Sequence, residues 1–75
     1  MTPAELDRAI LDGHASDDRP ALVRLYATAA DRAEASGDED ATCFFLTQAY
    51  VFALETGHDT VDDLHARLLR HGREE

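Results

Sequence analysis

The chain has 75 residues, a formal net charge of −9, one cysteine and no lysine or tryptophan. The single cysteine excludes an intrachain disulfide, and the acidity argues against binding to nucleic acid or anionic lipid, both of which would repel it. We expect one domain, residues 1–75, with a core near the lower size limit for independent folding.

The first residues lack the positive region and apolar core of a signal peptide. The longest apolar stretch, residues 41–54, is shorter than the roughly 20 residues that span a bilayer. The absence of lysine and asparagine beside abundant alanine and arginine indicates a GC-rich, bacterial genome. We therefore expect a cytoplasmic protein with no membrane-embedded segment.

Helix-start and helix-stop signals divide the chain into four segments. Thr2 to Glu5 forms a capping box, Asp18 and Pro20 start a second helix, and Asp38 caps a third. A second capping-box pattern, with Asp in place of Glu, begins at Thr60. Each segment ends at a glycine: Gly13, Gly37, Gly57 and Gly72. No stretch alternates with period two, so we predict an all-α fold with helices at about 3–12, 19–36, 39–56 and 60–71.

Helical periodicity predicts which side of each helix is buried. The second helix has one apolar stripe with charged residues opposite, as in an ordinary surface helix: Leu22, Leu25, Tyr26, Ala29, Ala30 and Ala33. The fourth has a shorter one: Val61, Leu64, Leu68 and Leu69. Apolar residues cover about 200° of the third: Phe52, Phe45, Ala49, Ala53, Leu46, Tyr50, Cys43 and Leu54. One neighbour cannot cover that arc, so we predict a central third helix, packed by the second helix and by the first or fourth. Phe45, Ala49, Phe52 and Ala53 should be among its most buried residues.

The remaining arc of the third helix is a candidate interaction surface. It mixes apolar and polar residues: Phe44, Thr47, Gln48, Val51 and Glu55. Phe44 and Val51 lie seven residues apart, on one line of the helix. A two-fold homodimer would bury both and enlarge a marginal core, so we predict self-association through Phe44, Gln48, Val51 and Glu55.

Residues 19–57 resemble a tetratricopeptide-type helical hairpin. The resemblance rests on two long helices joined at Gly37-Asp38, the second of which carries Tyr50-x-x-Ala53-Leu54-Glu55. The tryptophan and Leu-Gly positions of that family are missing, and the helices fit looser repeats of about 40 residues better. A second signal is the recurrence of Gly13-His14 as Gly57-His58, 44 residues later. The resemblance implies protein binding and no catalysis.

One group of residues has metal-ligand spacing: His58, Asp62 and His65. On a continuous helix they would lie within about 60° of one another. His58 precedes the expected helix start, however, and the structural interpretation is a loop histidine, a first-turn carboxylate and a histidine at the edge of the apolar face. Arg67, Arg70, His71 and Arg73 form a basic cluster that suits a helix C-terminus.

The sequence favours a small acidic interaction module, an adaptor or regulator that binds a protein partner or itself. We expect no cofactor and no catalytic site, because no phosphate loop and no nucleophile with a base at a suitable spacing occurs. The alternative is a metal-binding protein or enzyme that uses His58, Asp62 and His65.

Overall fold

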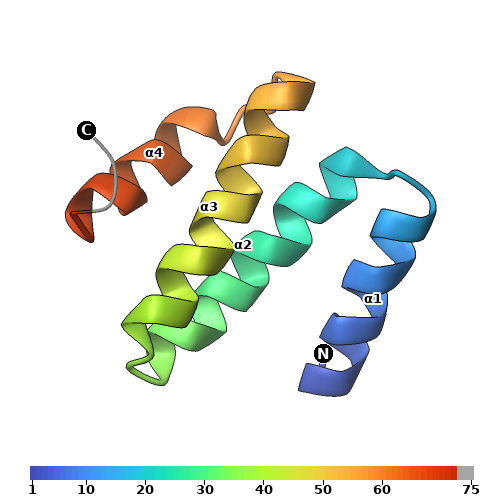
Figure 1. Cartoon of the computed structure of the whole chain (residues 1–75), viewed down its shortest axis with the longest axis horizontal. Coiled ribbons are helices and arrows are strands. Elements are labelled where there is room, and N and C mark those ends of the chain that lie inside the picture. The colour runs from blue at the N-terminus through green and yellow to red at the C-terminus, as the bar shows by residue number, and fades with distance from the viewer. Residues whose placement is uncertain (73–75) are drawn as a thin grey trace.

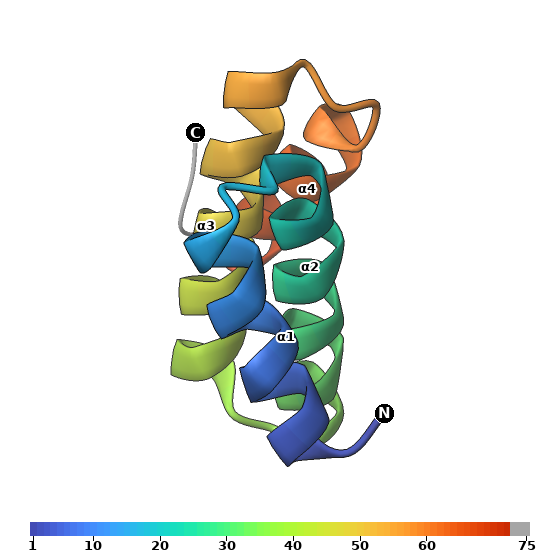
Figure 2. The ribbon, with the colours of Figure 1, turned by 90° about the vertical axis from the view of Figure 1, so that its right-hand side faces the viewer.

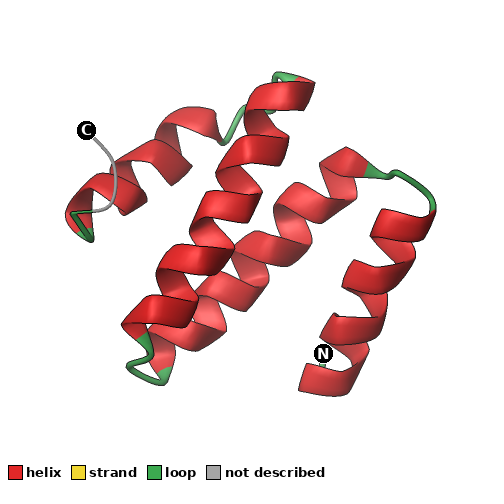
Figure 3. Cartoon of the chain, in the orientation of Figure 1, coloured by secondary structure: helices red, strands yellow, loops and turns green. Residues whose placement is uncertain are grey.

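A computed structural model of the chain describes residues 1–72. It contains four helices: α1 (Pro3–Ala15), α2 (Arg19–Ala35), α3 (Glu39–Thr56) and α4 (Val61–Arg70). No strand occurs in the described residues, which confirms the all-α prediction. The helices lie side by side in chain order and form a slab of 32 × 29 × 14 Å (Figure 1). Figure 3 shows that only short connections separate them.

The predicted caps of the first three helices are present. The Glu5 backbone N–H donates to Thr2 Oγ1 at 3.1 Å, and the Thr2 N–H donates to Glu5 Oε1 at 2.9 Å. These hydrogen bonds hold the pKa of Glu5 below its usual value. Asp38 Oδ1 accepts from the Ala41 N–H at 3.1 Å and caps α3. The predicted side-chain cap of α4 is wrong: Thr60 occupies that position without a capping hydrogen bond.

The predicted end of α1 at Gly13 is also wrong, because the helix continues to Ala15. Gly13 lies inside α1 against α2, where an added Cβ would come within 2.9 Å of Leu22 Cδ2. Glycine is therefore used here for close approach of two helices rather than as a stop signal. The left-handed residue that ends α1 is Asp17, with φ of 53°.

The connections after α1 and α2 repeat one hydrogen-bond pattern 20 residues apart. The Asp18 N–H donates to the Gly13 carbonyl at 2.9 Å, and the Asp38 N–H donates to the Ala33 carbonyl at 3.0 Å. Each aspartate then caps the next helix. The same bond follows α3, where the His58 N–H donates to the Ala53 carbonyl at 2.9 Å. Small residues at positions 13, 33 and 53 therefore occupy equivalent places, each closing a helix with a Schellman-type bond.

The 20-residue spacing of these hydrogen bonds, referred to below as the 20-residue frame, changes the interpretation of the recurrence of Gly13-His14 as Gly57-His58. Gly13 is helical, whereas Gly57 is left-handed with φ of 64°. The structural equivalent of Gly13 two helices later is Ala53, at a spacing of 40 residues.

The core lies mainly between α2 and α3, and both helices are central. α3 packs against α2 and α4, as predicted, while α2 packs against α1 and α3 rather than forming an ordinary surface helix. The largest fully buried side chains are Leu22, Leu46, Leu64, Leu68, Val23 and Thr42. Of the four residues predicted to be most buried, Ala49 and Ala53 are confirmed, whereas Phe45 and Phe52 are only partly buried. Those two rings lie at the edge of the hairpin, on the side of α1.

The slab has two distinguishable sides. Seen edge-on in Figure 2, α3 lies on one side and α2 on the other, with α1 nearest the viewer. The backbones of α1 and α3 do not contact each other, and only side chains from these helices meet across α2. Leu54 and Leu69, predicted on apolar faces, are exposed instead.

Candidate protein-binding face

The equivalence of α2 and α3 shows which apolar residues the fold does not need. Positions 24 and 44 are equivalent in the 20-residue frame and both are exposed, yet one is Arg24 and the other Phe44. Positions 31 and 51 are likewise exposed, and they hold Asp31 and Val51. On α2 these exposed positions hold charged residues. On α3 the equivalent positions hold Phe44 and Val51, whose exposed fractions are 57% and 45%. Packing within the chain does not account for these two apolar side chains.

A groove between α1 and α3 adjoins Phe44. α2 forms its floor, and two overlapping hollows of about 300 and 380 Å³ make up its length. Both hollows share Asp7, Ile10 and Phe45. Leu11, which is 62% exposed, lies on the α1 edge opposite Phe44 on the α3 edge. We refer to the surface formed by the residues that line these two hollows, Leu11 and Phe44 included, as the α1–α3 groove.

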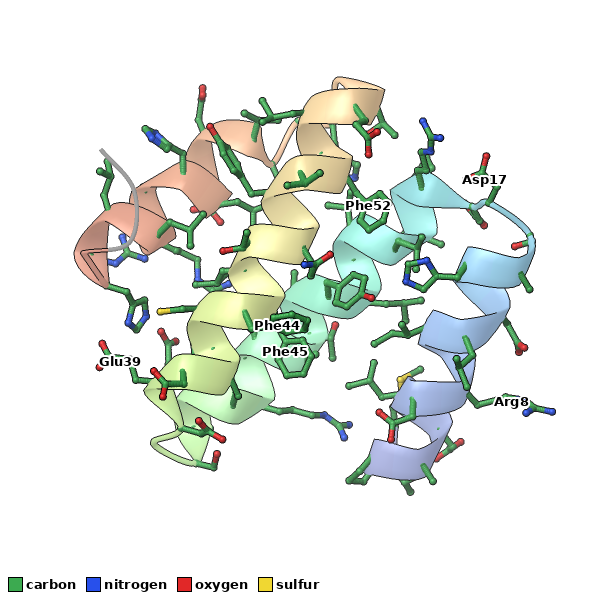
Figure 4. All side chains as sticks on the ribbon, viewed as in Figure 1. Arg8, Asp17, Glu39, Phe44, Phe45 and Phe52 are labelled. Atoms are coloured by element: carbon green, nitrogen blue, oxygen red, sulfur yellow. The ribbon has the colours of Figure 1, made fainter. Side chains whose placement is uncertain are left out.

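Aromatic rings form the α3 wall of this groove and close one end of it. Phe44 meets Phe45 edge to face, with ring centroids 5.5 Å apart, and Phe45 lies 6.3 Å from Tyr26. Figure 4 shows Phe44 and Phe45 projecting from α3 toward α1, over α2. Farther along α3, Phe52 stacks on Tyr26 at 6.0 Å and meets the ring of His14 at 5.8 Å. Because His14 belongs to α1, this last contact joins the two edges of the groove.

The buried hydroxyl of Tyr26 is satisfied from α1. His14 Nε2 and Tyr26 Oη are 2.8 Å apart, within hydrogen-bond distance. Burial raises the pKa of Tyr26 above its ordinary value. This hydrogen bond and the ring contacts fix α1 at its C-terminal end.

Charges along the groove are mainly negative. The Asp7 carboxylate forms no hydrogen bond or ion pair within residues 1–72. Asp38 lines the same groove while capping α3. The arginine of the lining, Arg32, donates to the Met1 carbonyl and interacts with the charge of Glu5. The groove therefore offers an apolar surface beside an uncompensated carboxylate.

The remaining members of the predicted interaction arc lie on the same helix. Gln48 is half-buried, and Glu55 is exposed, with Oε2 3.9 Å from Arg19 Nη1. Sequence reasoning missed Leu11 and Asp7, because it placed the interaction surface on the third helix alone. A comparison of the chain with itself at an offset of 20 residues points to Phe44 and Val51 as well, which the helical periodicity had already identified.

The residues of the candidate metal group do not converge on one site. His58 Nδ1 lies 2.8 Å from Thr60 Oγ1 and 3.2 Å from Asp59 Oδ1. His65 stacks on Tyr50, with ring centroids 5.6 Å apart. Asp62 is exposed in the first turn of α4. Among residues 1–72, no three His, Cys, Asp or Glu side chains are grouped so that they could hold a metal ion.

Two members of the predicted basic cluster, Arg67 and His71, lie close to carboxylates within the chain, whereas Arg70 is exposed. Arg67 Nη2 lies 2.8 Å from Asp31 Oδ1. His71 Nε2 lies 3.2 Å from Glu34 Oε2, and His71 Nδ1 lies 3.2 Å from Glu39 Oε1. Hydrogen bonds to Glu39 and then Glu34 raise the pKa of His71 above its usual value. These contacts attach α4 to the α2–α3 connection. Arg73 lies outside the described residues.

Comparisons with family models, with curated proteins and with solved structures give no match for this chain. The tetratricopeptide resemblance stays a prediction. Over residues 1–72, no helix combines the length and the apolar character needed to cross a membrane.

Proposed function

We propose that the protein is a small interaction module, an adaptor or regulator that binds another protein. The binding surface would be the α1–α3 groove together with Phe44 and Val51 on the exposed side of α3. The observation that carries this proposal is the exposure of Phe44 and Val51 at positions where the equivalent residues of α2 are charged. Exposed apolar groups of this kind are typical of surfaces that another chain covers. Leu11, on the opposite edge, extends the apolar surface across the groove.

A peptide-display selection tests this proposal. Random peptides selected on the wild-type protein should lose binding when Phe44→Ser or Leu11→Ser is introduced. Leu69→Ser is the matched control, because Leu69 is 44% exposed on α4, away from the groove. Binders that are indifferent to Phe44 and Leu11, or the absence of binders, would contradict the proposal.

The same surface supports a second candidate, the predicted two-fold homodimer. A second copy would bury Phe44 and Val51 and add core to a chain of 8.3 kDa. Light scattering after size exclusion, over a dilution series, should then give twice the chain mass, and Phe44→Glu should give monomers with unchanged helix content. A monomer at every concentration would exclude the dimer and leave the first proposal in place.

A further inference from the structure

We propose that the α1–α3 groove binds an amphipathic helix of another protein, with apolar residues that enter the groove and lysine or arginine beside them. This inference rests on the proposed function and specifies the chemistry of the partner.

The shape and lining of the groove suit the apolar side of a helix. Its floor is the buried surface of α2, and its edges carry the exposed side chains of Leu11 and Phe44. A helix presents apolar residues at intervals of three, four and seven positions, which form a ridge of the kind that such grooves accept. The backbones of α1 and α3 do not contact each other, and the two hollows between them, of about 300 and 380 Å³, are bounded at one end by the contact of His14 with Phe52.

The charge of the groove selects the partner's polar residues. Asp7 lines both hollows, lies one turn before Leu11, and forms no ion pair within the described residues. Arg32 donates a hydrogen bond to the Met1 carbonyl and interacts electrostatically with Glu5. A cation one turn from an apolar anchor on the partner would therefore reach Asp7. The net charge of −9 would also speed the approach of a basic partner.

The same charges disfavour a second copy as the occupant. Each copy has a formal net charge of −9, so two copies repel each other overall. Arg8, on the outer side of α1, is already near Asp12, with Nε 3.8 Å from Oδ1.

A display library with a fixed apolar pattern tests the inference directly. Peptides of about 16 residues, long enough for roughly four helical turns, carry leucine at helical spacing. Lysine, glutamine or glutamate is randomised at the other positions. Selection is carried out on the wild-type protein at low ionic strength, where surface charges are least screened.

We expect lysine to be enriched beside the leucines. The best selected peptide should bind about 1.5- to 5-fold more weakly to Asp7→Asn, the range measured for exposed ion pairs. Asp63→Asn, which removes an exposed carboxylate from α4, is the matched charge control and should change nothing.

The outcomes separate this inference from the proposed function. Binders that need Phe44 but carry no lysine bias, or are rich in glutamate, would overturn the charge preference and leave the proposed function standing. No binders, or binders that survive both Phe44→Ser and Leu11→Ser, would overturn both. Lysine-rich binders that are equally sensitive to Asp7→Asn and Asp63→Asn would reflect total charge and would also overturn the inference.

Discussion

The two outer helices are attached to the central hairpin in different ways. α4 places Leu64 and Leu68 in the core and adds the ion pairs of Arg67 and His71 to α2 and to the start of α3. α1 buries Leu6 and packs Gly13 against the buried side chain of Leu22, but its exposed edge leaves the groove open. The difference shows that a helix can be firmly attached at one end and still leave an apolar surface uncovered. The face that we assign to binding therefore lies beside α1.

The largest expected effect comes from the leucines that anchor the outer helices. Leu68→Ala should lower the free energy of unfolding by about 2–5 kcal/mol, since the side chain is fully buried. Leu6→Ala should lower it less, because Leu6 lines the groove and the space left by the substitution opens to water. Urea denaturation followed by circular dichroism measures both. A larger loss for Leu6→Ala would contradict the expectation that the space left at Leu6 opens to water.

The close approach of α1 to α2 gives the next effect. Gly13→Val should destabilise the protein by about 1–3 kcal/mol, because the new side chain would overlap the buried Leu22. Ala15→Val is the control, since Ala15 is exposed near the end of the same helix and the substitution changes only helix propensity. Equal stability of the two variants would mean that the helices can separate at little cost.

The ion pairs of α4 should matter more than those of α1. Arg67→Gln should cost about 1 kcal/mol or less, because its carboxylate partners are largely exposed to water. Arg8→Gln, at a fully exposed pair on α1, should change nothing measurable. Raising the salt concentration should reduce the difference between the two variants. A loss that does not depend on salt would point to packing of the arginine stem instead.

His71 adds a pH-dependent contribution to the attachment of α4. Because its pKa is raised in the folded state, the stabilisation is fully present below the ordinary histidine pKa of about 6.5. It is lost as the pH rises through the raised value. The difference in urea midpoint between wild type and His71→Gln should therefore be largest at about pH 5.5, below the ordinary histidine pKa, and should be smaller at about pH 9. Glu39→Gln removes the carboxylate with the largest influence and should reduce this difference. A difference that is unchanged between these pH values would exclude the His71 contacts as its source.

Local signals in the sequence predicted the helices well. Thr2, Asp18 and Asp38 mark the starts of three helices because capping depends only on the neighbouring backbone. Gly13 misled the prediction, since a glycine at a helix crossing and a glycine at a helix end look the same in sequence. Its role depends on Leu22, which belongs to another helix.

The candidate face could be predicted only in part. Phe44 and Val51 were identified because the helical wheel of α3 leaves them outside the main apolar arc. Phe45 and Phe52 were expected to be fully buried, but the small residues Ala49 and Ala53 fill the α2–α3 contact and leave the rings at its edge. The groove itself depends on how far α1 stands from α3, which no local pattern specifies.

The backbone of each helix contacts only the helices that precede and follow it in the chain. This arrangement determines how the molecule can unfold locally. Each terminal helix can separate without disturbing the helix at the other end, so opening should proceed in steps from the ends rather than all at once. Amide protons of α2 and α3 should then exchange most slowly, and those at the N-terminal end of α1 fastest. Since the backbone contacts join only consecutive helices, folding should also be fast for a protein of this size.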